Sequence, residues 1–405
     1  MRSSRLTLRP LAGDVTASDE DAAWLHGETE QPMTRVVETL IERHHPHSRL
    51  HLSGSPLVPL PGHVREAVDA AATVPGYAPS GGEPALREAI SASLEARGIR
   101  VSPEQVIVTC GAMHALDLVF RSVLQPGDEV LMPAPGFFIG GLARQLGARV
   151  VWFPSPASAR FRPSWAAAEA AVTPRTRILY VNTPVNPTGY VYDEMDVGAA
   201  ADLAARAGLL LVSDESLSGF VYGGRQHLSP AAGHPELRGV LVGSFSKDYA
   251  MPGMRVGYAV LPPELLGRVS ALLEWSLLAV SRPAQAAALA ALTGPRDWLD
   301  AMAADAARRG SRAARALAAI GGLSCVPPRG GLNLFPHFAG DAEGLARDLI
   351  VRFGVPVCPG PAFGSAGYFR LQFGGAWQDL QLALRYIKEA AASRGSPPAR
   401  RNAPS

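Results

Sequence analysis

The chain has 405 residues, 47% hydrophobic and 18% charged, which is typical of a folded protein long enough for two domains. Its formal net charge of +2 offers no large basic surface to nucleic acid or an acidic membrane, so a small charged substrate must be bound by local groups. No run approaches the roughly 18 apolar residues of a membrane span, and the N-terminus lacks the apolar core of a signal peptide. Cys110, Cys325 and Cys358 form no CxxC pair, which indicates reduced thiols, so we expect a soluble, cytoplasmic protein.

Both ends of the chain have the composition of flexible segments. Residues 1–25 show no sustained periodicity, and residues 393–405 are rich in Pro, Ser and Arg, as in a solvated tail. Between them, short β-branched runs alternate with Ala-rich helical stretches, an order that predicts an α/β fold with a mainly parallel sheet. The strands expected, in chain order, are 106–110, 129–133, 149–153, 177–181, 209–213 and 239–244.

The C-terminal part of the sequence has a different pattern. A long Ala- and Arg-rich helix is predicted over about 296–320, and GLSCVPPRGGLNLFPHF and YFRLQFGG follow it with the pattern of strands in a smaller α+β domain. We therefore expect an N-terminal arm over 26–60, a large domain over 61–290 and a small domain over 291–392.

Polar residues follow four of the predicted strands. Gly111 follows the first of them, the run 182–189 the fourth, Asp214 the fifth and the run 244–247 the sixth. Because ligands of parallel α/β sheets bind beyond the carboxyl ends of the strands, these residues are expected to meet in one crevice.

The stretch SFSKDYAMPGMRVGY, residues 244–258, places Lys247 directly after a buried strand. Burial and nearby cations lower the pKa of an amine, which makes it a nucleophile toward an aldehyde. Arg255, with Ser244 and Ser246, suits a phosphate dianion through charge-assisted hydrogen bonds. The alternative, an ordinary surface lysine and arginine, is disfavoured by the combination.

The segment TCGAMHALDLVF, residues 109–120, is a turn of small residues that opens a helix. Backbone N–H groups of Gly111, Ala112 and Met113 are predicted to cradle a phosphate at the positive end of this helix. Many strand–helix turns contain glycine, so the pattern by itself also fits a simple connection.

Four further residues have both a functional and a plain structural interpretation. Asp214 ends an apolar strand, where it either pairs with a protonated pyridine nitrogen or caps a helix. Asn186, in NTPVNPTGY, either donates to a phenolate oxygen or serves the turn alone. Phe137, in PGFF, lies against a cofactor ring or in the core. Arg370, inside the apolar strand YFRLQFG, needs a carboxylate partner, which an amino-acid substrate supplies.

In combination these motifs resemble the class I and II aminotransferases, a branch of the fold-type I pyridoxal phosphate (PLP) enzymes in the aspartate aminotransferase superfamily. The resemblance runs from about Leu52 to Arg370. It implies a PLP-dependent enzyme acting on an α-amino acid, with a seven-stranded-type, mainly parallel sheet in the large domain and a smaller α+β domain. SFSK with Gly253 and Arg255 resembles the family's Schiff-base and phosphate segment, so Lys247 is expected to hold PLP as a Schiff base and to shuttle the proton.

The resemblance implies a role for each remaining site residue. Asp214 is expected to pair with the pyridinium nitrogen, and Arg370 to clamp the substrate α-carboxylate with Gly54 beside it. Tyr77, in YAPSGGEPALREA, matches a tyrosine that reaches the phosphate held by the partner subunit, which implies a homodimer with active sites at the interface. The other cofactor ligands implied are Gly111, Ala112, Met113, Ser244, Ser246 and Arg255 at the phosphate, Asn186 at the phenolate oxygen and Phe137 against the ring.

The sequence departs from the family next to the pyridinium aspartate. The family pattern is Asp-Glu-x-Tyr, whereas Leu217 stands where the tyrosine hydroxyl would bind the phenolate oxygen, and Val185 replaces a commonly polar residue. A hydrogen bond to a charged oxygen contributes about 1.5–3 kcal/mol, so its loss is expected to change how the reaction partitions. Leu217 and the stretch PPRGGLNLFPHF also resemble actinobacterial natural-product enzymes such as capreomycidine synthase.

Two reactions therefore stay open. An aminotransferase, exchanging an amino acid and a 2-oxo acid, is favoured by its frequency in the family. A non-transaminating PLP enzyme, performing β- or γ-elimination, replacement, cyclisation or oxidation, is favoured by Leu217. A PLP-sensing regulator is disfavoured, because the N-terminal segment is too short for a winged helix and the charge is near neutral.

Two other features have an open or structural interpretation. The histidine cluster ERHHPHSRLH, residues 42–51, has irregular spacing, so we expect a solvated helix end and no metal site. Arg282, in SRPAQ, lies in a segment that approaches the partner's site in relatives. It either meets an acidic substrate group or has a structural role.

Overall fold

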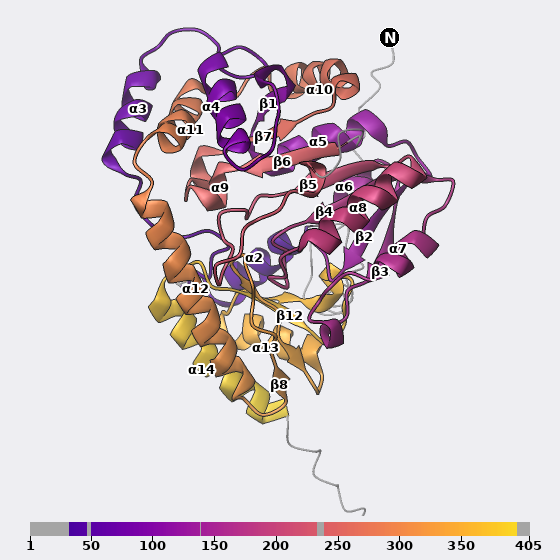
Figure 1. Ribbon diagram of the computed structural model, residues 1–405. Coiled ribbons are helices and arrows are strands. Elements are labelled where there is room, and N and C mark those ends of the chain that lie inside the picture. Colours follow the sequence, from indigo (N-terminus) through magenta and orange to yellow (C-terminus); the bar gives the residue numbers. More distant parts are fainter. Residues whose placement is uncertain (1–31, 47–49, 138, 233–238, 395–405) are drawn as a thin grey trace, which may run out of the picture.

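The computed structural model describes residues 32–46, 50–137, 139–232 and 239–394. Of the two segments expected to be flexible, 1–25 lies outside the described residues, and so does 393–405 except for the end of the last helix, Trp377–Arg394 (α14). Figure 1 shows a large sheet with its helices in the upper part of the molecule and the smaller sheets below it, beside α12 and α14.

Seven strands form the large sheet, in the spatial order β1-β7-β6-β5-β4-β2-β3. The predicted mainly parallel α/β sheet is confirmed, because β2 to β6 pair in parallel and β7 runs antiparallel to both β1 and β6. The strands span Val106–Thr109 (β1), Glu129–Ala134 (β2), Arg149–Pro154 (β3), Thr176–Asn182 (β4), Leu210–Asp214 (β5), Gly239–Ser244 (β6) and Gly257–Val260 (β7).

Helices cover both faces of this sheet, as the alternation along β5 illustrates. Leu210 and Val212 pack in a core shared with α5, α6 and α10, whereas Leu211 packs on the opposite face in a core shared with α8. Leu241 of β6 lies in a third core, with α3, α4 and α11. These helices span Gly62–Ala72 (α3), Pro84–Glu95 (α4), Gly111–Val123 (α5), Gly140–Gln145 (α6), Trp165–Ala170 (α7), Glu194–Ala207 (α8), Phe245–Asp248 (α9), Pro263–Ser276 (α10) and Arg282–Thr293 (α11).

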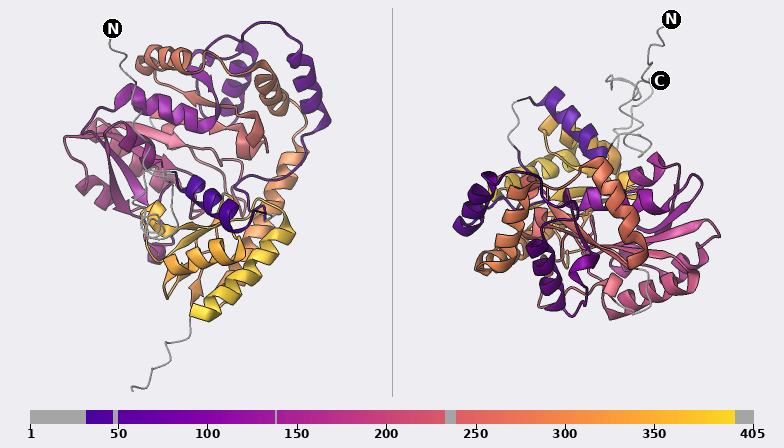
Figure 2. Two further views of the ribbon diagram at one scale, coloured as in Figure 1. Left: turned by 180° about the vertical axis from the view of Figure 1, so that it is seen from behind. Right: turned by 90° about the horizontal axis from the view of Figure 1, so that it is seen from above.

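The C-terminal part contains two small antiparallel sheets, one pairing β8 with β10 and one ordered β11-β12-β9. In the left view of Figure 2 the orange and yellow helices of the C-terminal part lie together with these sheets at the lower end of the molecule. The helix expected over about 296–320 is α12, Asp297–Ala318. The other elements span Met33–His44 (α2), Leu323–Ser324 (β8), Asn333–Leu334 (β9), His337–Phe338 (β10), Ala342–Phe353 (α13), Cys358–Pro359 (β11) and Phe369–Gln372 (β12).

One apolar core connects the small sheets to the face of the large sheet that carries α8. It joins Leu211 of β5 to Leu349 of α13 and Leu371 of β12. The division into an arm, a large and a small domain stays a prediction.

The histidine cluster lies where α2 ends. The helix ends at His44, and the ring Nε2 of His45 lies 2.8 Å from the carbonyl oxygen of Val351. His47 falls outside the described residues. Within the described ranges, no three His, Cys, Asp or Glu residues form a group able to hold a metal ion, and no helix is long and apolar enough to cross a membrane.

Candidate active site

Lys247 lies on the four-residue helix α9, directly after β6. Ser244 caps this helix, because its side chain accepts a hydrogen bond from the backbone N–H of Ser246 at 3.1 Å. Burial lowers the pKa of the Lys247 amine, and the positive charges of Arg255 and Arg370 lower it further. The sequence therefore places Lys247 where its amine is easier to deprotonate than an ordinary lysine.

Charges from three other segments of the chain act on Lys247. Asp214 at the end of β5 opposes the lowering of its pKa, while Arg255 before β7 and Arg370 on β12 add to it. These residues were expected to share one crevice, and the structure brings them within electrostatic reach of a single amine.

Gly111 and Arg255 meet at the N-terminus of α5. Gly111 has a φ of +76°, and a Cβ at this position would lie 2.7 Å from Nη2 of Arg255, so only glycine leaves room for the guanidinium. Nη1 of Arg255 donates to Oγ of Ser246 at 3.3 Å. Ala112 is half-buried and Met113 is 41% exposed on the next positions of α5. A helix N-terminus, an arginine and a serine hydroxyl form an arrangement that can hold an anion.

Asp214 is buried and firmly held. The hydroxyl of Tyr180 donates to its Oδ2 at 3.0 Å, and the backbone N–H of Ser216 donates to Oδ1 at 3.0 Å. Asn182 supports the same turn, because its Nδ2 donates to the Asp214 carbonyl oxygen at 2.9 Å. These donors stabilise a carboxylate at the carboxyl end of the sheet.

Arg370 is buried on β12, where it contacts the NPTG turn. Its Nη1 donates to Oδ1 of Asn186 at 3.3 Å, and its Nη2 donates to Sγ of Cys358 at 3.3 Å. The guanidinium also lies 5.1 Å from the centre of the Phe363 ring. Because Oδ1 of Asn186 accepts from the arginine, its Nδ2 is the atom left to donate into the crevice.

The segment around Gly54 connects the lysine helix with β12. Oγ of Ser55 donates to the carbonyl oxygen of Ser246 at 2.7 Å, and the backbone N–H of Gly374 donates to the Ser53 carbonyl oxygen at 2.8 Å. Gly54 lies against Gln372, since a Cβ on this glycine would fall 2.3 Å from Nε2 of that side chain. The structure thus places Gly54 against a residue two positions along β12 from Arg370.

Among the described residues, Tyr77 and Phe137 have no hydrogen bond with Lys247 or with the two arginines near it. Tyr77 is 82% exposed in the single chain, and its carbonyl oxygen accepts from Nη2 of Arg282 at 2.8 Å. Arg282 also pairs with Glu83 at 2.8 Å, so the structure gives it an intramolecular partner. Phe137 is half-buried in the turn after β2, against the core that contains α5.

Leu217, which stands where the family has a tyrosine, is buried in the apolar core. A Cβ added to Gly331 would lie 3.6 Å from its Cδ1, which places the side chain beside the segment before β9.

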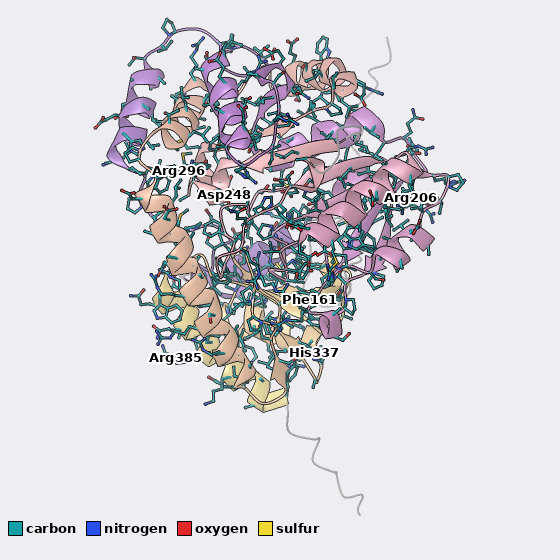
Figure 3. The ribbon with its side chains drawn as sticks, viewed as in Figure 1. Phe161, Arg206, Asp248, Arg296, His337 and Arg385 are labelled. Carbon is teal, nitrogen blue, oxygen red and sulfur yellow. The ribbon has the colours of Figure 1, made fainter. Side chains whose placement is uncertain are left out.

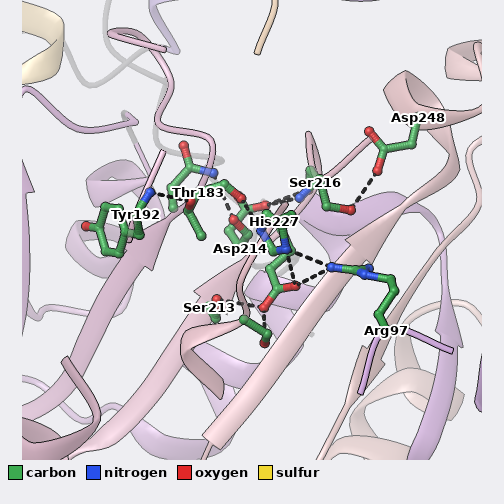
Figure 4. Close-up of polar contacts among 12 residues, drawn as sticks. Arg97, Thr183, Tyr192, Ser213, Asp214, Ser216, His227 and Asp248 are labelled. Carbon is green, nitrogen blue, oxygen red and sulfur yellow. Dashed lines mark hydrogen bonds and ion pairs between the residues drawn. The ribbon is translucent and has the colours of Figure 1, made fainter. Parts of the chain in front are cut away.

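A second polar network, which the sequence did not predict, lies on the other face of β5. Glu215 accepts from Oγ of Ser213 at 3.0 Å and pairs with Arg97 at 3.4 Å (Figure 4). Burial raises the pKa of Glu215 to about 7 and lowers the pKa of His227 to about 3. Arg97 donates to Nδ1 of His227 at 2.7 Å, so the neutral ring donates through Nε2 to the Thr183 carbonyl oxygen at 3.0 Å.

The signal for this network was present in the sequence as strand alternation. Successive side chains of a strand point to opposite faces, and Glu215 directly follows the end of β5, so its side chain is expected to diverge from that of Asp214. The long-range partners, Arg97 and His227, carried no comparable signal.

The fold and this crevice define an α/β enzyme of fold type I, with a lysine at the carboxyl ends of the strands. The sequence of residues 51–387 matches the model of the aminotransferase class I and II family. The chain therefore belongs to this family of PLP-dependent aminotransferases.

Individual relatives agree with this assignment. The aspartate/prephenate aminotransferase of Thermus thermophilus is 34% identical over 342 residues, 82% of this chain and 88% of that protein. The structure of the aspartate aminotransferase from Thermus thermophilus with maleate superposes with a TM-score of 0.81 at 32% identity, covering 89% of this chain and 97% of that one. The aromatic aminotransferase from Pyrococcus horikoshii OT3 superposes with a TM-score of 0.80 at 28% identity, covering 87% and 99%.

These relatives favour the aminotransferase over the elimination or cyclisation chemistry that Leu217 had favoured. The weaker resemblance to capreomycidine synthase stays a prediction.

Proposed function

We propose that Lys247 holds PLP, that the surrounding residues bind its phosphate, pyridine nitrogen and phenolate oxygen, and that Arg370 binds the α-carboxylate of an amino acid. The observation that carries this proposal is the convergence of Asp214, Arg255 and Arg370 on the Lys247 amine. When bound, PLP supplies an electron sink for bond cleavage at the substrate Cα.

The described residues fit the chemical groups of PLP. The space kept by Gly111, the guanidinium of Arg255 and the hydroxyl of Ser246 suit a phosphate dianion, with Ser244, Ala112 and Met113 beside them. The buried carboxylate of Asp214, held by the Tyr180 hydroxyl and by the backbone N–H and hydroxyl of Ser216, suits a protonated pyridine nitrogen.

The Lys247 amine is suited to move the proton at the substrate Cα, because its lowered pKa makes the unprotonated, basic form easier to reach than in an ordinary lysine. Nδ2 of Asn186 is the donor available to the phenolate oxygen, and Leu217 adds no second one. Arg370 holds the α-carboxylate of the amino acid and then that of the oxo acid, with Gly54 nearby. Phe137 is assigned to the ring face.

We also propose a homodimer in which Tyr77 reaches the phosphate held by the partner subunit. Tyr77 is 82% exposed and Trp275 is 90% exposed in the single chain, which leaves both rings available to a partner subunit and supports this assignment. Sedimentation of the purified full-length chain tests the dimer, and a monomer under assay conditions would contradict it.

The sequence makes the central test direct, because Lys247 and Lys388 are its two lysines. The full-length chain is mixed with PLP, reduced with borohydride and mapped by mass spectrometry. We expect the adduct on Lys247, its loss in Lys247→Ala and its retention in the matched Lys388→Ala control. An adduct that maps to Lys388, or that survives in Lys247→Ala, contradicts the proposal.

The reaction itself is tested with a panel of amino acids and a 2-oxo acid acceptor. We expect a new oxo acid and a new amino acid in equal amounts. Release of ammonia or a cyclised product with no amino group transferred would show a different reaction.

A further inference from the structure

Cys358 is a buried thiol that lies opposite Arg370 in the small sheet. The strands β11 and β12 pair antiparallel, with Cys358 directly across from Arg370. Side chains that are directly opposite each other on two antiparallel strands project to the same face of the sheet. The register of this sheet therefore brings the thiol to the guanidinium, and Nη2 of Arg370 donates to Sγ of Cys358 at 3.3 Å.

The guanidinium of Arg370 is held by contacts with three separate segments of the chain. Its Nη1 donates to Oδ1 of Asn186 in the NPTG turn at 3.3 Å, and its Nη2 donates to Cys358 on β11. The ring of Phe363, in the turn after β11, has its centre 5.1 Å from the guanidinium carbon. Because a guanidinium is a rigid planar fork, contacts at both Nη atoms fix the plane and the direction of the whole group.

Phe363 is itself held by a cluster of rings around the small sheets. The ring of Phe335 lies 5.7 Å from that of Phe363 and is stacked on Tyr368 at 4.9 Å. Phe161 and His337 both contact Tyr368, at 6.0 and 5.0 Å, and Figure 3 labels them near each other in the lower part of the molecule. The ring beside the guanidinium is therefore fixed independently of the thiol, so that a substitution of the thiol tests the hydrogen bond.

The surroundings of this hydrogen bond make its loss consequential. Cys358 is 5% exposed and Arg370 is 4% exposed, and Cys358 belongs to the apolar core that joins the small sheets to the large one. Bulk water does not readily replace an acceptor at such a position, so a guanidinium N–H that loses the sulfur atom must reorient or stay unsatisfied.

We propose that Cys358 is a positioning residue for Arg370, because by accepting from Nη2 it sets the orientation in which the guanidinium meets the α-carboxylate of the amino acid. This proposal rests on the proposed function of Arg370, and the thiol itself contacts no substrate in it. The α-carboxylate is common to all amino acids. The loss of Cys358 is therefore expected to weaken the binding of an amino acid and to spare an amine that lacks this group.

The test measures binding to the full-length, PLP-loaded enzyme without a 2-oxo acid acceptor. The absorbance of bound PLP is followed while alanine, aspartate or phenylalanine is added, and the concentration at half of the spectral change is determined. The amino acid with the lowest such concentration is then compared with its matched amine, which is ethylamine, 3-aminopropanoate or phenethylamine. Each amine keeps the side chain of its amino acid and lacks the α-carboxylate.

We expect Cys358→Ala to raise the half-saturation concentration of the amino acid about three- to tenfold and to leave that of the amine within about twofold. Cys358→Ser keeps an acceptor at this position, so it should stay within about twofold of the parent for both compounds. Cys325→Ala is the matched control, because Cys325 is a half-buried thiol whose Sγ donates to the carbonyl oxygen of Val326 at 3.7 Å. It should leave both titrations unchanged.

An unchanged titration of the amino acid in Cys358→Ala overturns the proposal, and so does an equal change for the amine or in Cys325→Ala. If Cys358→Ala does not fold, as judged by circular dichroism, Cys358→Val replaces it with the same expectation, since valine fills the space without an acceptor.

Arg370→Lys distinguishes the failure of this proposal from the failure of the proposed function. Unchanged binding of the amino acid in Arg370→Lys would show that Arg370 does not bind the α-carboxylate, and both proposals would fall. Weaker binding in Arg370→Lys together with unchanged binding in Cys358→Ala would overturn the role of Cys358 alone.

Discussion

Tyr180 and Tyr192 offer a direct test of how Asp214 is stabilised, because both rings are fully buried and only one hydroxyl has a partner. The Tyr180 hydroxyl donates to Oδ2 of Asp214 at 3.0 Å, whereas the Tyr192 hydroxyl has no hydrogen bond within the described residues. A hydrogen bond to a charged group contributes about 1.5–3 kcal/mol, while removing an unpaired buried hydroxyl is neutral or stabilising. We therefore expect Tyr180→Phe to lower the free energy of unfolding by about 2 kcal/mol and Tyr192→Phe to leave it unchanged or raise it.

The assay is urea unfolding of the PLP-free full-length chain at neutral pH, followed by circular dichroism, for the parent and both variants. The same variants are then titrated with PLP. Tyr180→Phe is expected to weaken PLP binding about tenfold or more, because Asp214 is held less firmly, and Tyr192→Phe to leave it unchanged. Equal unfolding midpoints for the two variants would refute the assigned hydrogen bond as the source of stability.

Three further substitutions test the two polar regions of the structure. Gly111→Ala should weaken PLP binding about tenfold or more, because the added Cβ displaces Arg255. Gly208→Ala is the control: its φ of +65° is similar but the space around it is open, so PLP binding should stay within about twofold. Equal effects of the two substitutions on PLP binding would contradict the phosphate site. The pKa of Glu215 is raised from 4.5 to about 7, so the folded state binds this proton more tightly than the unfolded state does. The free energy of unfolding therefore falls as pH rises between these values, by an amount on the order of 3 kcal/mol. Unfolding measured against pH should show that Glu215→Gln removes this decrease. The pKa of His227 is lowered from 6.5 to about 3, so the free energy of unfolding decreases as pH falls between these values. His227→Gln should make the free energy of unfolding less dependent on pH in this range. An unchanged dependence on pH would contradict a buried neutral ring.

The sequence predicted the strands that carry the site because each is a short, buried β-branched run. The strand expected over 177–181 is Thr176–Asn182, and that over 209–213 is Leu210–Asp214. β7, Gly257–Val260, was missed. It is short, follows Arg255 almost directly, and pairs antiparallel with β6 and with the distant strand β1, so nothing local distinguished it from the motif before it.

The roles of the site residues stay predictions. At Asp214 the sequence predicted the position of the residue but not its hydrogen-bond donor. Its position after a buried strand was evident from the sequence. Its donor Tyr180 was not, because that contact depends on the register of β4 against β5. Tyr180 pairs with Val212 and Asn182 with Asp214, which makes Tyr180 and Asp214 diagonal neighbours on one face. A shift of one residue would have moved Tyr180 to the opposite face.

Two polar groups lie close together at the end of β5, Asp214 with its donors and the network around Glu215, and they are on opposite faces of the sheet. Leu210 and Val212 share a core with α5, and Asp214 continues that face at the carboxyl end of the strand. Ser213 and Glu215 continue the other face, where their side chains are hydrogen-bonded to each other. Lys247 follows the neighbouring strand β6, and the negative charge of Asp214 opposes the lowering of its pKa. The alternation at the end of this strand therefore places Asp214 on one face of the sheet and the Ser213–Glu215 contact on the other, so that Glu215 can be altered while Asp214 stays in place.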